Sequence, residues 1–422
     1  MADSTHSTGW YAGATRAERL HDALARNRFA GLLALGPENA AWLSGRTSTI
    51  ATLWRLPGLV GVAAGADGSL AVSAGDQEVA SYATAEAGRF PHPLWIEHHD
   101  LRGGDAARAL ADRIADARPA GALNRPAQFD PEALLDAAAS AARAAVPNGG
   151  RVGIDLAGTP GWVAAGLEQR LRAAGIEPVE ATAVFDDLRA IKDPADIERL
   201  RLAAELTETG IAAARDALRP GLAAQGVVAA YQSAIWARAA SEDRFAELRQ
   251  VEGLVTVGDG TAPAVVGPGV TVKLDMQVDV GGMHSDVGRT YALAPTAEQR
   301  EVFAALNDAL AAAIAAMAPG VPFRDVWAAG IGAMRAAGYV GYSRGHLGHS
   351  VGLAHHYEEA PFIAADEPRP LAPGMVLSVE LPWYLPGIGQ FQLERMVLVG
   401  DSGCDVLDTL PLNLAVEPAA NG

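Results

Sequence analysis

Acidic residues lie inside two apolar stretches of this 422-residue sequence. In the first stretch, Val272 to Thr290, runs rich in apolar residues flank Gly281-Gly282, a pair typical of a hairpin turn. If the hairpin closes at Val280 and Gly281, Asp275 lies directly opposite Asp286, with Cβ atoms about 4.5–5.5 Å apart. Facing carboxylates repel each other, so a buried pair needs a cation between them. The alternative is a solvated hairpin with acidic outer residues, but the flanking apolar residues favour burial.

A second apolar hairpin carries a second pair of acidic residues. The sequence predicts a strand that begins at Val376 and ends near Pro382, a turn centred on Gly387 and a return strand at Gln390–Val399. In that register Glu380 lies opposite Glu394. Four buried carboxylates require about four positive charges, and two divalent ions supply that number.

Histidines gather in a short segment between these hairpins. Four of the ten histidines fall within residues 346–356, and neutral imidazole is the commonest metal ligand. The alternative for any one of them is a position in a surface loop. Four carboxylates and one imidazole form an oxygen-rich set that suits Mn²⁺, Co²⁺, Fe²⁺ or Zn²⁺. Asp279 shares the strand face of Asp275 and is either a further ligand or an acid without that role.

The composition excludes several classes of function. The chain has 33 basic and 50 acidic residues, a net charge of −17, which disfavours nucleic acid and anionic membranes as partners. One cysteine is too few for an intrachain disulfide or a cysteine-based metal cluster. No apolar run approaches ~18 residues, and the polar start of the chain lacks the pattern of a secretory signal. We expect a soluble, cytoplasmic protein.

The chain is expected to form two domains. Up to residue 185, predicted helices such as 131–145 alternate with short strands, among them a hairpin at 59–72, which is typical of an α/β layer. Beyond this point a long helix begins at Pro194, and pairs of helices alternate with strand-rich stretches. The predicted domains are residues 1–185 and 186–422.

In these residues the chain resembles metallopeptidase family M24, which contains aminopeptidase P, prolidase, methionine aminopeptidase and creatinase. The family pattern is Asp, a second Asp eleven positions later, His in Gly-His-x-x-Gly, and two later Glu residues. All five positions match, at Asp275, Asp286, His349, Glu380 and Glu394. The resemblance covers nearly the whole chain. It implies a creatinase-like α/β amino-terminal domain and an α+β catalytic domain with the pita-bread fold.

The resemblance also implies a dinuclear metal centre. Asp275 would chelate one ion, and Asp286 and Glu394 would bridge both ions. His349 and Glu380 would hold the second ion. The expected cofactors are two divalent ions, Mn²⁺ first, with Co²⁺, Zn²⁺ or Fe²⁺ as alternatives, and a homodimer is the expected assembly.

Two residues are the candidate catalytic residues. Glu380 would move protons in addition to holding metal. His356, seven residues after His349, matches the second histidine of the family and would stabilise the tetrahedral intermediate.

The residues that surround the ligands depart from the family pattern. Proline-specific members carry a His four residues before the metal His; this chain has Gly345 there, and His346 is one residue away. Gln392 replaces an Arg two residues before the last Glu, so a charged contact becomes neutral. His346, Gln392 and Trp383, which lies beside a ligand position, are the candidate substrate-binding residues.

The expected function is therefore metal-dependent hydrolysis of short peptides, similar to aminopeptidase P and prolidase, with Xaa-Pro specificity in doubt. The alternative is a related enzyme that acts on a non-peptide small molecule. Such an enzyme would hydrolyse a C–N bond, as creatinase and ectoine hydrolase do, or act as a lyase. A third hypothesis, a non-catalytic binding module, is disfavoured because all five ligand positions are kept.

Overall fold

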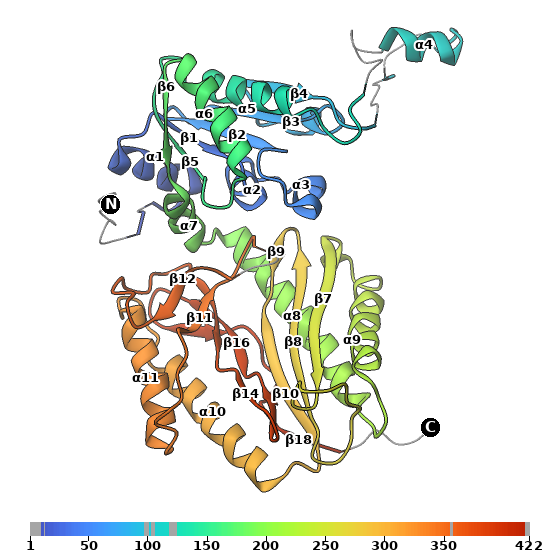
Figure 1. Ribbon diagram of the computed structural model, residues 1–422, viewed down its shortest axis with the longest axis vertical. Helices are drawn as coiled ribbons and strands as arrows, with labels where there is room; N and C mark the ends of the chain where they lie inside the picture. The colour runs from blue at the N-terminus through green and yellow to red at the C-terminus, as the bar shows by residue number, and fades with distance from the viewer. Residues whose placement is uncertain are drawn as a thin grey trace. The chain divides into compact units, whose positions relative to one another are not determined.

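The computed structural model describes residues 10–11, 13–96, 101–102, 106–117, 125–354 and 358–417. The chain divides into two compact units, Tyr11–Leu188 and a second unit that begins at Arg189 and also includes Trp10. The division falls after Leu188, close to the predicted boundary at residue 185. The predicted fold class is confirmed, with an α/β amino-terminal unit and an α+β carboxyl-terminal unit (Figure 1).

The amino-terminal unit contains a six-stranded mixed sheet with the order β4-β3-β2-β1-β5-β6. Its strands are β1 (Gly31–Ala34), β2 (Gly61–Gly65), β3 (Leu70–Gly75), β4 (Gly88–His92), β5 (Gly150–Ile154) and β6 (Ile176–Glu180). The β1–β2 and β2–β3 pairs are antiparallel, and the other pairs are parallel. The hairpin predicted at residues 59–72 is β2–β3.

This part of the chain has helices before, between and after its strands. They are α1 (Arg16–Asn27), α2 (Pro37–Ser44), α3 (Thr49–Trp54), α4 (Leu110–Ala117), α5 (Pro131–Ala145), α6 (Gly161–Ala173) and α7 (Thr182–Ala190), with a 3₁₀ turn η1 (Val79–Ser81). Helix α5 has the predicted bounds because Asp130 caps it and Pro131 occupies its first position. Its buried alanines pack on β2, β3 and β4.

The described residues of the carboxyl-terminal unit form two five-stranded sheets, each covered by a pair of helices, and a small two-stranded sheet. The first half consists of α8 (Pro194–Asp216), α9 (Ala224–Ala239), η2 (Asp243–Phe245), β7 (Leu248–Val257), β8 (Thr271–Val280), β9 (Met283–His284) and β10 (Val287–Leu293). The sheet has the order β18-β10-β8-β7, with β9 paired to β8 and with β18 (Ala415–Val416) at its edge. Helices α8 and α9 pack against β8 and β7.

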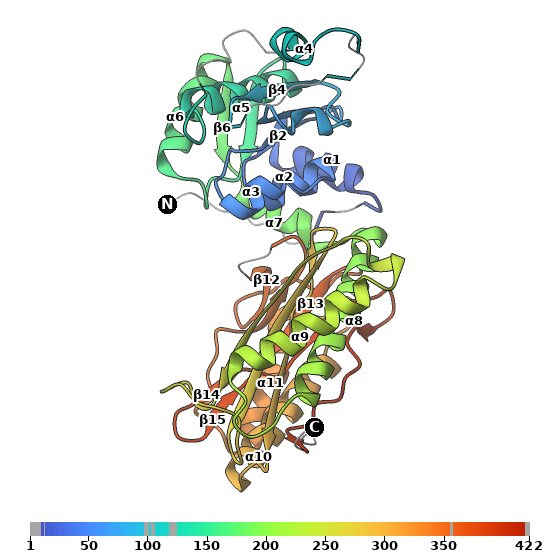
Figure 2. The same cartoon turned by 90° about the vertical axis from the view of Figure 1, so that its right-hand side faces the viewer.

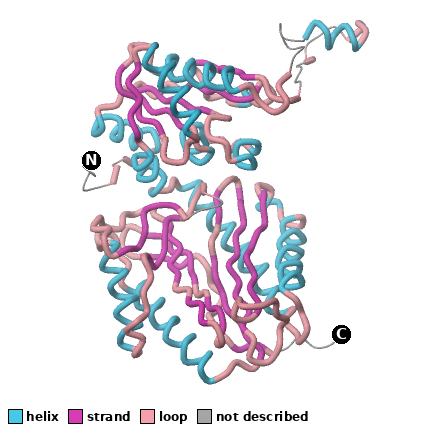
Figure 3. The backbone as a smooth tube through the Cα atoms, in the orientation of Figure 1, coloured by secondary structure: helices cyan, strands magenta, loops and turns pink. Residues whose placement is uncertain are grey.

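The second half repeats this arrangement. It consists of α10 (Ala297–Ala315), α11 (Phe323–Ala336), β11 (His346–Ser350), β12 (Glu359–Ala364), β13 (Val376–Glu380), β16 (Glu394–Val399) and β17 (Cys404–Val406). The sheet order is β12-β11-β13-β16-β17, and β14 (Trp383–Leu385) pairs with β15 (Gly389–Phe391) in the hairpin loop. Within this unit the two helix pairs lie on opposite outer sides, with the strands between them (Figures 2 and 3).

Strand alternation decides which side chains face the interior between the sheets. On β8, Leu274, Met276 and Val278 belong to the apolar core shared with α8 and α9. The intervening residues Asp275 and Gln277 point to the other face. Because β10 of the first sheet contacts β16 of the second, the polar faces of the two sheets meet at one place. Within the described part of the chain, no helix is both long and apolar enough to cross a membrane.

Candidate metal centre and active site

The first hairpin closes one residue later than predicted. Gly281 and Gly282 form its two-residue turn, and both have positive φ, 62° and 94°. Val280 pairs with Met283 across this turn. The predicted closure at Val280 and Gly281 is wrong, because a turn with two positive φ values needs both glycines at its centre.

This register places Asp275 opposite Gly288 instead of opposite Asp286. The two aspartates still share one face of the sheet, since the side-chain period of a strand is two residues. A Cβ atom on Gly288 would lie 2.8 Å from Glu394 Oε2 and 2.4 Å from Gln392 Cγ. Gly288 therefore leaves the space in which the second hairpin brings its carboxylate beside Asp275.

The second hairpin has the predicted register. Glu380 pairs with Glu394, and Leu385 pairs with Gly389 on either side of Gly387. The facing of these two carboxylates is confirmed. Between them Gln392 donates from Nε2 to Glu380 Oε2 at 2.9 Å and to Glu394 Oε2 at 3.3 Å.

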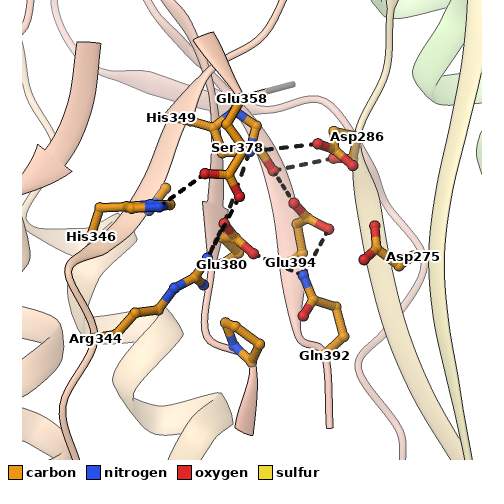
Figure 4. A network of polar contacts seen from close by, with 12 residues as sticks. Asp275, Asp286, Arg344, His346, His349, Glu358, Ser378, Glu380, Gln392 and Glu394 are labelled. Carbon is orange, nitrogen blue, oxygen red and sulfur yellow. Dashed lines mark hydrogen bonds and ion pairs between the residues drawn. The ribbon is translucent and has the colours of Figure 1, made fainter. Parts of the chain in front are cut away.

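Asp286 directly before β10, His349 on β11 and Glu394 on β16 converge on one point (Figure 4). One ligand atom of each lies within 4.8 Å of the others. His349 Nε2 is 3.5 Å from Asp286 Oδ2. The carbonyl oxygen of Ser350 lies 2.9 Å from His349 Nδ1 and accepts its hydrogen bond, so that Nε2 is the ring nitrogen that could bind a metal.

The crowding of acidic groups at this point disfavours their charged forms. Burial raises the pKa of Asp286 well above its usual range, and the Asp275 and Glu380 carboxylates raise it further. Burial and then Asp286 raise the pKa of Glu394 in the same way. Asp286 Oδ1 is buried and has no hydrogen-bond partner among the described residues. An unpartnered buried carboxylate oxygen among other carboxylates fits a metal-binding site.

The two outer carboxylates each have a cationic side chain beside them. Lys273 Nζ lies 3.2 Å from Asp275 Oδ2, and Arg344 Nη2 lies 2.5 Å from Glu380 Oε1. The sequence predicted only a neutral contact from Gln392. The structure shows that the guanidinium of Arg344, which lies outside the hairpin, also contacts Glu380. The spacing of residues in the sequence did not predict this contact.

A second group of possible ligands, His346, Glu358 and Glu380, is also within 4.8 Å. Arg344 is a cation of this group, since Nη2 contacts Glu380 and lies 3.9 Å from Glu358 Oε1. His346 Nε2 lies 2.9 Å from Glu358 Oε2, while Nδ1 accepts a hydrogen bond from Gly348 N at 3.3 Å. The His346 hydrogen bond lowers the pKa of Glu358 to about 2. His346 thus holds an ionised Glu358.

A pocket of about 530 Å³ is lined by residues of both groups, but His346 and Arg344 are not part of its lining. Its lining includes all five predicted ligands, together with Gln392 and Glu358. Sequence analysis missed Glu358, although it follows the histidine-rich segment directly. Trp383 is not part of this lining, and its ring packs edge-on against Tyr339 and Tyr342 at 5.1 and 5.2 Å. The predicted catalytic residue His356 lies outside the described residues.

Two further polar residues support the strands that carry the site. Asp279 accepts a hydrogen bond from Gly282 N at 2.6 Å and therefore fixes the hairpin turn. Lys192 donates to Ser350 Oγ at 2.6 Å beside His349. Burial lowers the pKa of Lys192 to about 8.

Facing sheets flanked by helix pairs, with carboxylates on their inner faces, define the pita-bread class of fold. Residues 198–401, which form most of the carboxyl-terminal unit, match the model of metallopeptidase family M24.

Two sequence relatives illustrate the similarity. The "Probable dipeptidase PepE" of Mycobacterium tuberculosis is 32% identical over 250 residues, which cover 59% of this chain and 66% of the relative. An uncharacterized peptidase of Staphylococcus aureus is 29% identical over 228 residues, 52% of this chain and 63% of the relative. The aligned region thus spans less than two thirds of each relative.

Solved structures share the fold over nearly the full chain. Dipeptidase PepE from Mycobacterium ulcerans has a TM-score of 0.69 and 23% identity, with 98% of this chain and 99% of that chain covered. An Xaa-Pro dipeptidase from Bacillus anthracis has a TM-score of 0.71 and 18% identity, with coverage of 95% and 99%. At these identities the likeness concerns the fold.

Proposed function

We propose that this protein is a metal-dependent hydrolase of short peptides. The observation that carries the proposal is the convergence of Asp286, His349 and Glu394, flanked by Asp275 and Glu380, in one pocket of the M24 unit. The names of its relatives, dipeptidase and peptidase, support peptides as substrates.

Five side chains would hold two divalent ions in this proposal. Asp275 would hold one ion, Asp286 and Glu394 would contact both, and His349 and Glu380 would hold the other. Bound ions of this kind polarise a scissile carbonyl and lower the pKa of water. The oxygen-rich donor set favours Mn²⁺, with Co²⁺, Zn²⁺ or Fe²⁺ as alternatives.

Glu380 is the proposed residue for proton transfer. Its carboxylate lines the pocket, and Arg344 and Gln392 hold its two oxygens from opposite sides. This clamp fixes the direction in which Glu380 faces a substrate. The stabilisation of a tetrahedral intermediate by His356 stays a prediction.

Two pocket residues are proposed to contact the substrate. Gln392 Oε1 is buried and has no hydrogen-bond partner within the described ranges, so it can accept an N–H of a peptide. Glu358 presents an ionised carboxylate, which suits a free amino group. His346 is proposed to act through Glu358, because both of its ring nitrogens are already engaged. The role of Trp383 in substrate binding stays a prediction.

We also propose the kinds of partner, the cellular location and the assembly of the protein. The net charge of −17 supports a protein that binds neither nucleic acid nor anionic membranes. We propose a cytoplasmic homodimer, in line with the sequence resemblance.

The test is mass-spectrometric cleavage of a peptide panel by the full-length protein with excess Mn²⁺. The panel pairs Xaa-Pro with Xaa-Ala di- and tripeptides, and Glu380→Gln and Asp286→Ala serve as controls. We expect cleavage that both substitutions abolish or reduce by about 100-fold or more. Cleavage of only the Xaa-Pro members would establish proline specificity. A metal-loaded protein that cleaves no peptide would refute the proposal and favour a non-peptide C–N substrate.

A further inference from the structure

Strands β11 and β12 are joined by a loop that forms part of the pocket. Strand β11 ends at Ser350 and β12 begins at Glu359, and these two residues are paired across the ladder. The loop between them, residues 351–358, lines part of the pocket and carries Glu358. Ser350 and Glu359 are therefore the two points from which this loop leaves the sheet.

A buried lysine lies beside both of these points. Lys192 is 6% exposed, and its Nζ donates to Ser350 Oγ at 2.6 Å. A Cβ atom built on Gly352 would lie 3.6 Å from both Lys192 Nζ and Glu359 Oε1, so the ammonium and the carboxylate border the same small space. The backbone of Lys192 is fixed as well, because its N–H donates to Gly374 O at 2.9 Å. The ammonium is thus held where the loop begins and ends.

Glu359 connects the loop to this ammonium and to a second cation. Its side chain is buried, and Oε1 accepts a hydrogen bond from Ala354 N, inside the loop. Oε2 lies 3.4 Å from Nε of Arg189, which is also buried. A buried carboxylate needs partners of this kind, and the removal of one partner leaves an uncompensated charge.

These contacts join segments that are far apart in the sequence but lie in the same unit of the fold. Arg189 and Lys192 precede α8, whereas the loop belongs to the second half of the unit. The position of the loop therefore depends on a segment about 160 residues earlier in the chain. Glu358 directly precedes Glu359, so its backbone follows any movement of that residue.

We propose that Glu359, Lys192 and Arg189 are positioning residues that hold loop 351–358 against the pocket. They would act through Glu358, whose carboxylate is proposed above to bind the free amino group of a peptide. The inference rests on the proposed function and deepens it. Its consequence is that the segment before α8 determines in part how tightly a short peptide binds.

Glu359→Gln tests this role in the full-length protein with Mn²⁺. The substitution removes the charge but keeps the size of the side chain and an acceptor for Ala354 N. We expect KM for a cleaved di- or tripeptide to rise about tenfold, with kcat and Mn²⁺ affinity within about twofold of the wild type. A general loss of folded protein would instead lower kcat and leave KM unchanged.

Two further variants complete the kinetic test. Glu205→Gln is the matched control, because it removes a carboxylate that pairs with Arg244 at 2.6 Å outside the pocket lining, and it should leave KM unchanged. The double variant Lys192→Met with Glu359→Gln removes both charges, and it replaces the single variant if that one does not fold. We expect its KM to be no higher than that of Glu359→Gln, since the two residues act as one unit. A KM that stays at the wild-type value in both Glu359 variants would overturn the inference.

Amide hydrogen exchange tests the loop without a substrate. In peptic fragments that contain Ala354, we expect exchange to become about tenfold faster in Glu359→Gln, with β8 fragments unchanged. Unchanged exchange at Ala354 would overturn the inference even if the wild-type protein cleaves peptides. A wild-type protein that cleaves no peptide refutes the proposed function, and faster exchange in the variant would then still support the holding of the loop.

Discussion

Gly288 gives the most direct test of how the two hairpins meet. Its backbone φ is not positive, so alanine fits the local conformation. The added Cβ would lie 2.4 Å from Gln392 Cγ and 2.8 Å from Glu394 Oε2. Carbon atoms in contact are normally about 3.5–4.0 Å apart, so Gly288→Ala requires a shift of roughly 1 Å. Gln392 and Glu394 are 2% and 1% exposed, which leaves little room for them to move.

The size of the effect follows from this shift. Overpacking of a buried site typically reduces the free energy of unfolding by about 1–3 kcal/mol. Metal–ligand distances are maintained within about 0.2 Å, so a displacement of Glu394 by ~1 Å removes it from a shared metal site. We expect Mn²⁺ affinity to fall and kcat/KM for peptide cleavage to decrease about 100-fold.

The assay combines urea unfolding with Mn²⁺ titration of the full-length variant. Gly332→Ala is the control, because Gly332 lies exposed on α11 and its added Cβ meets no atom within 4 Å. We expect this control to keep wild-type metal binding and to gain up to about 1 kcal/mol of stability from helix propensity. If Gly288→Ala kept both the unfolding free energy and the metal affinity of the wild type, the described packing of Gly288 against Glu394 would be wrong.

Two other substitutions test the charges around the site. The raised pKa values of Asp286 and Glu394 contribute stability that is present below about pH 4 and is lost as pH rises through the folded-state values. Asp286→Asn should therefore stabilise the metal-free protein at pH 8 by about 1–3 kcal/mol, flatten the dependence of Tm on pH, and abolish the rise in Tm on addition of Mn²⁺. Parallel Tm profiles for variant and wild type between pH 5 and 8 would contradict this reasoning. Arg289 is 1% exposed and binds the Asp408 carboxylate and the Glu394 carbonyl oxygen behind the site, so Arg289→Met should cost about 3–5 kcal/mol in urea unfolding. The double variant Arg289→Met with Asp408→Asn should recover part of that loss, and equal losses in the single and double variants would argue against the buried pair.

The sequence was sufficient to predict which face of each hairpin carries the candidate metal ligands. Side chains alternate with a period of two residues, so Asp275 and Asp286 lie on one face of the hairpin in both registers. This holds for the predicted turn at Val280 and Gly281 and for the observed turn at Gly281 and Gly282. The facing of Glu380 and Glu394 was predicted correctly because the turn centre, Gly387, lies equally far along the chain from both residues. Local periodicity also predicted helix α5 with its bounds.

Contacts between distant segments could not be predicted in this way. The register of the first hairpin depends on the φ values of Gly281 and Gly282, and the approach of Glu394 depends on the missing side chain of Gly288. The predicted opposition of Asp275 and Asp286 was wrong for this reason. Glu358 was missed because it lies outside the strands and its partner His346 is on β11, twelve positions earlier in the chain.

The sequence by itself determined which residue types could bind metal and on which strand faces they lie, because strand periodicity is a local property. The tertiary structure decided which cationic side chains lie beside the acidic candidate ligands. Arg344 reaches Glu380 from 36 positions away, and among the described residues no lysine or arginine pairs with Asp286, whereas Lys273 pairs with Asp275. These differences arise from the way the two sheets pack, since Coulomb energies depend on distance in space and on burial rather than on separation along the chain.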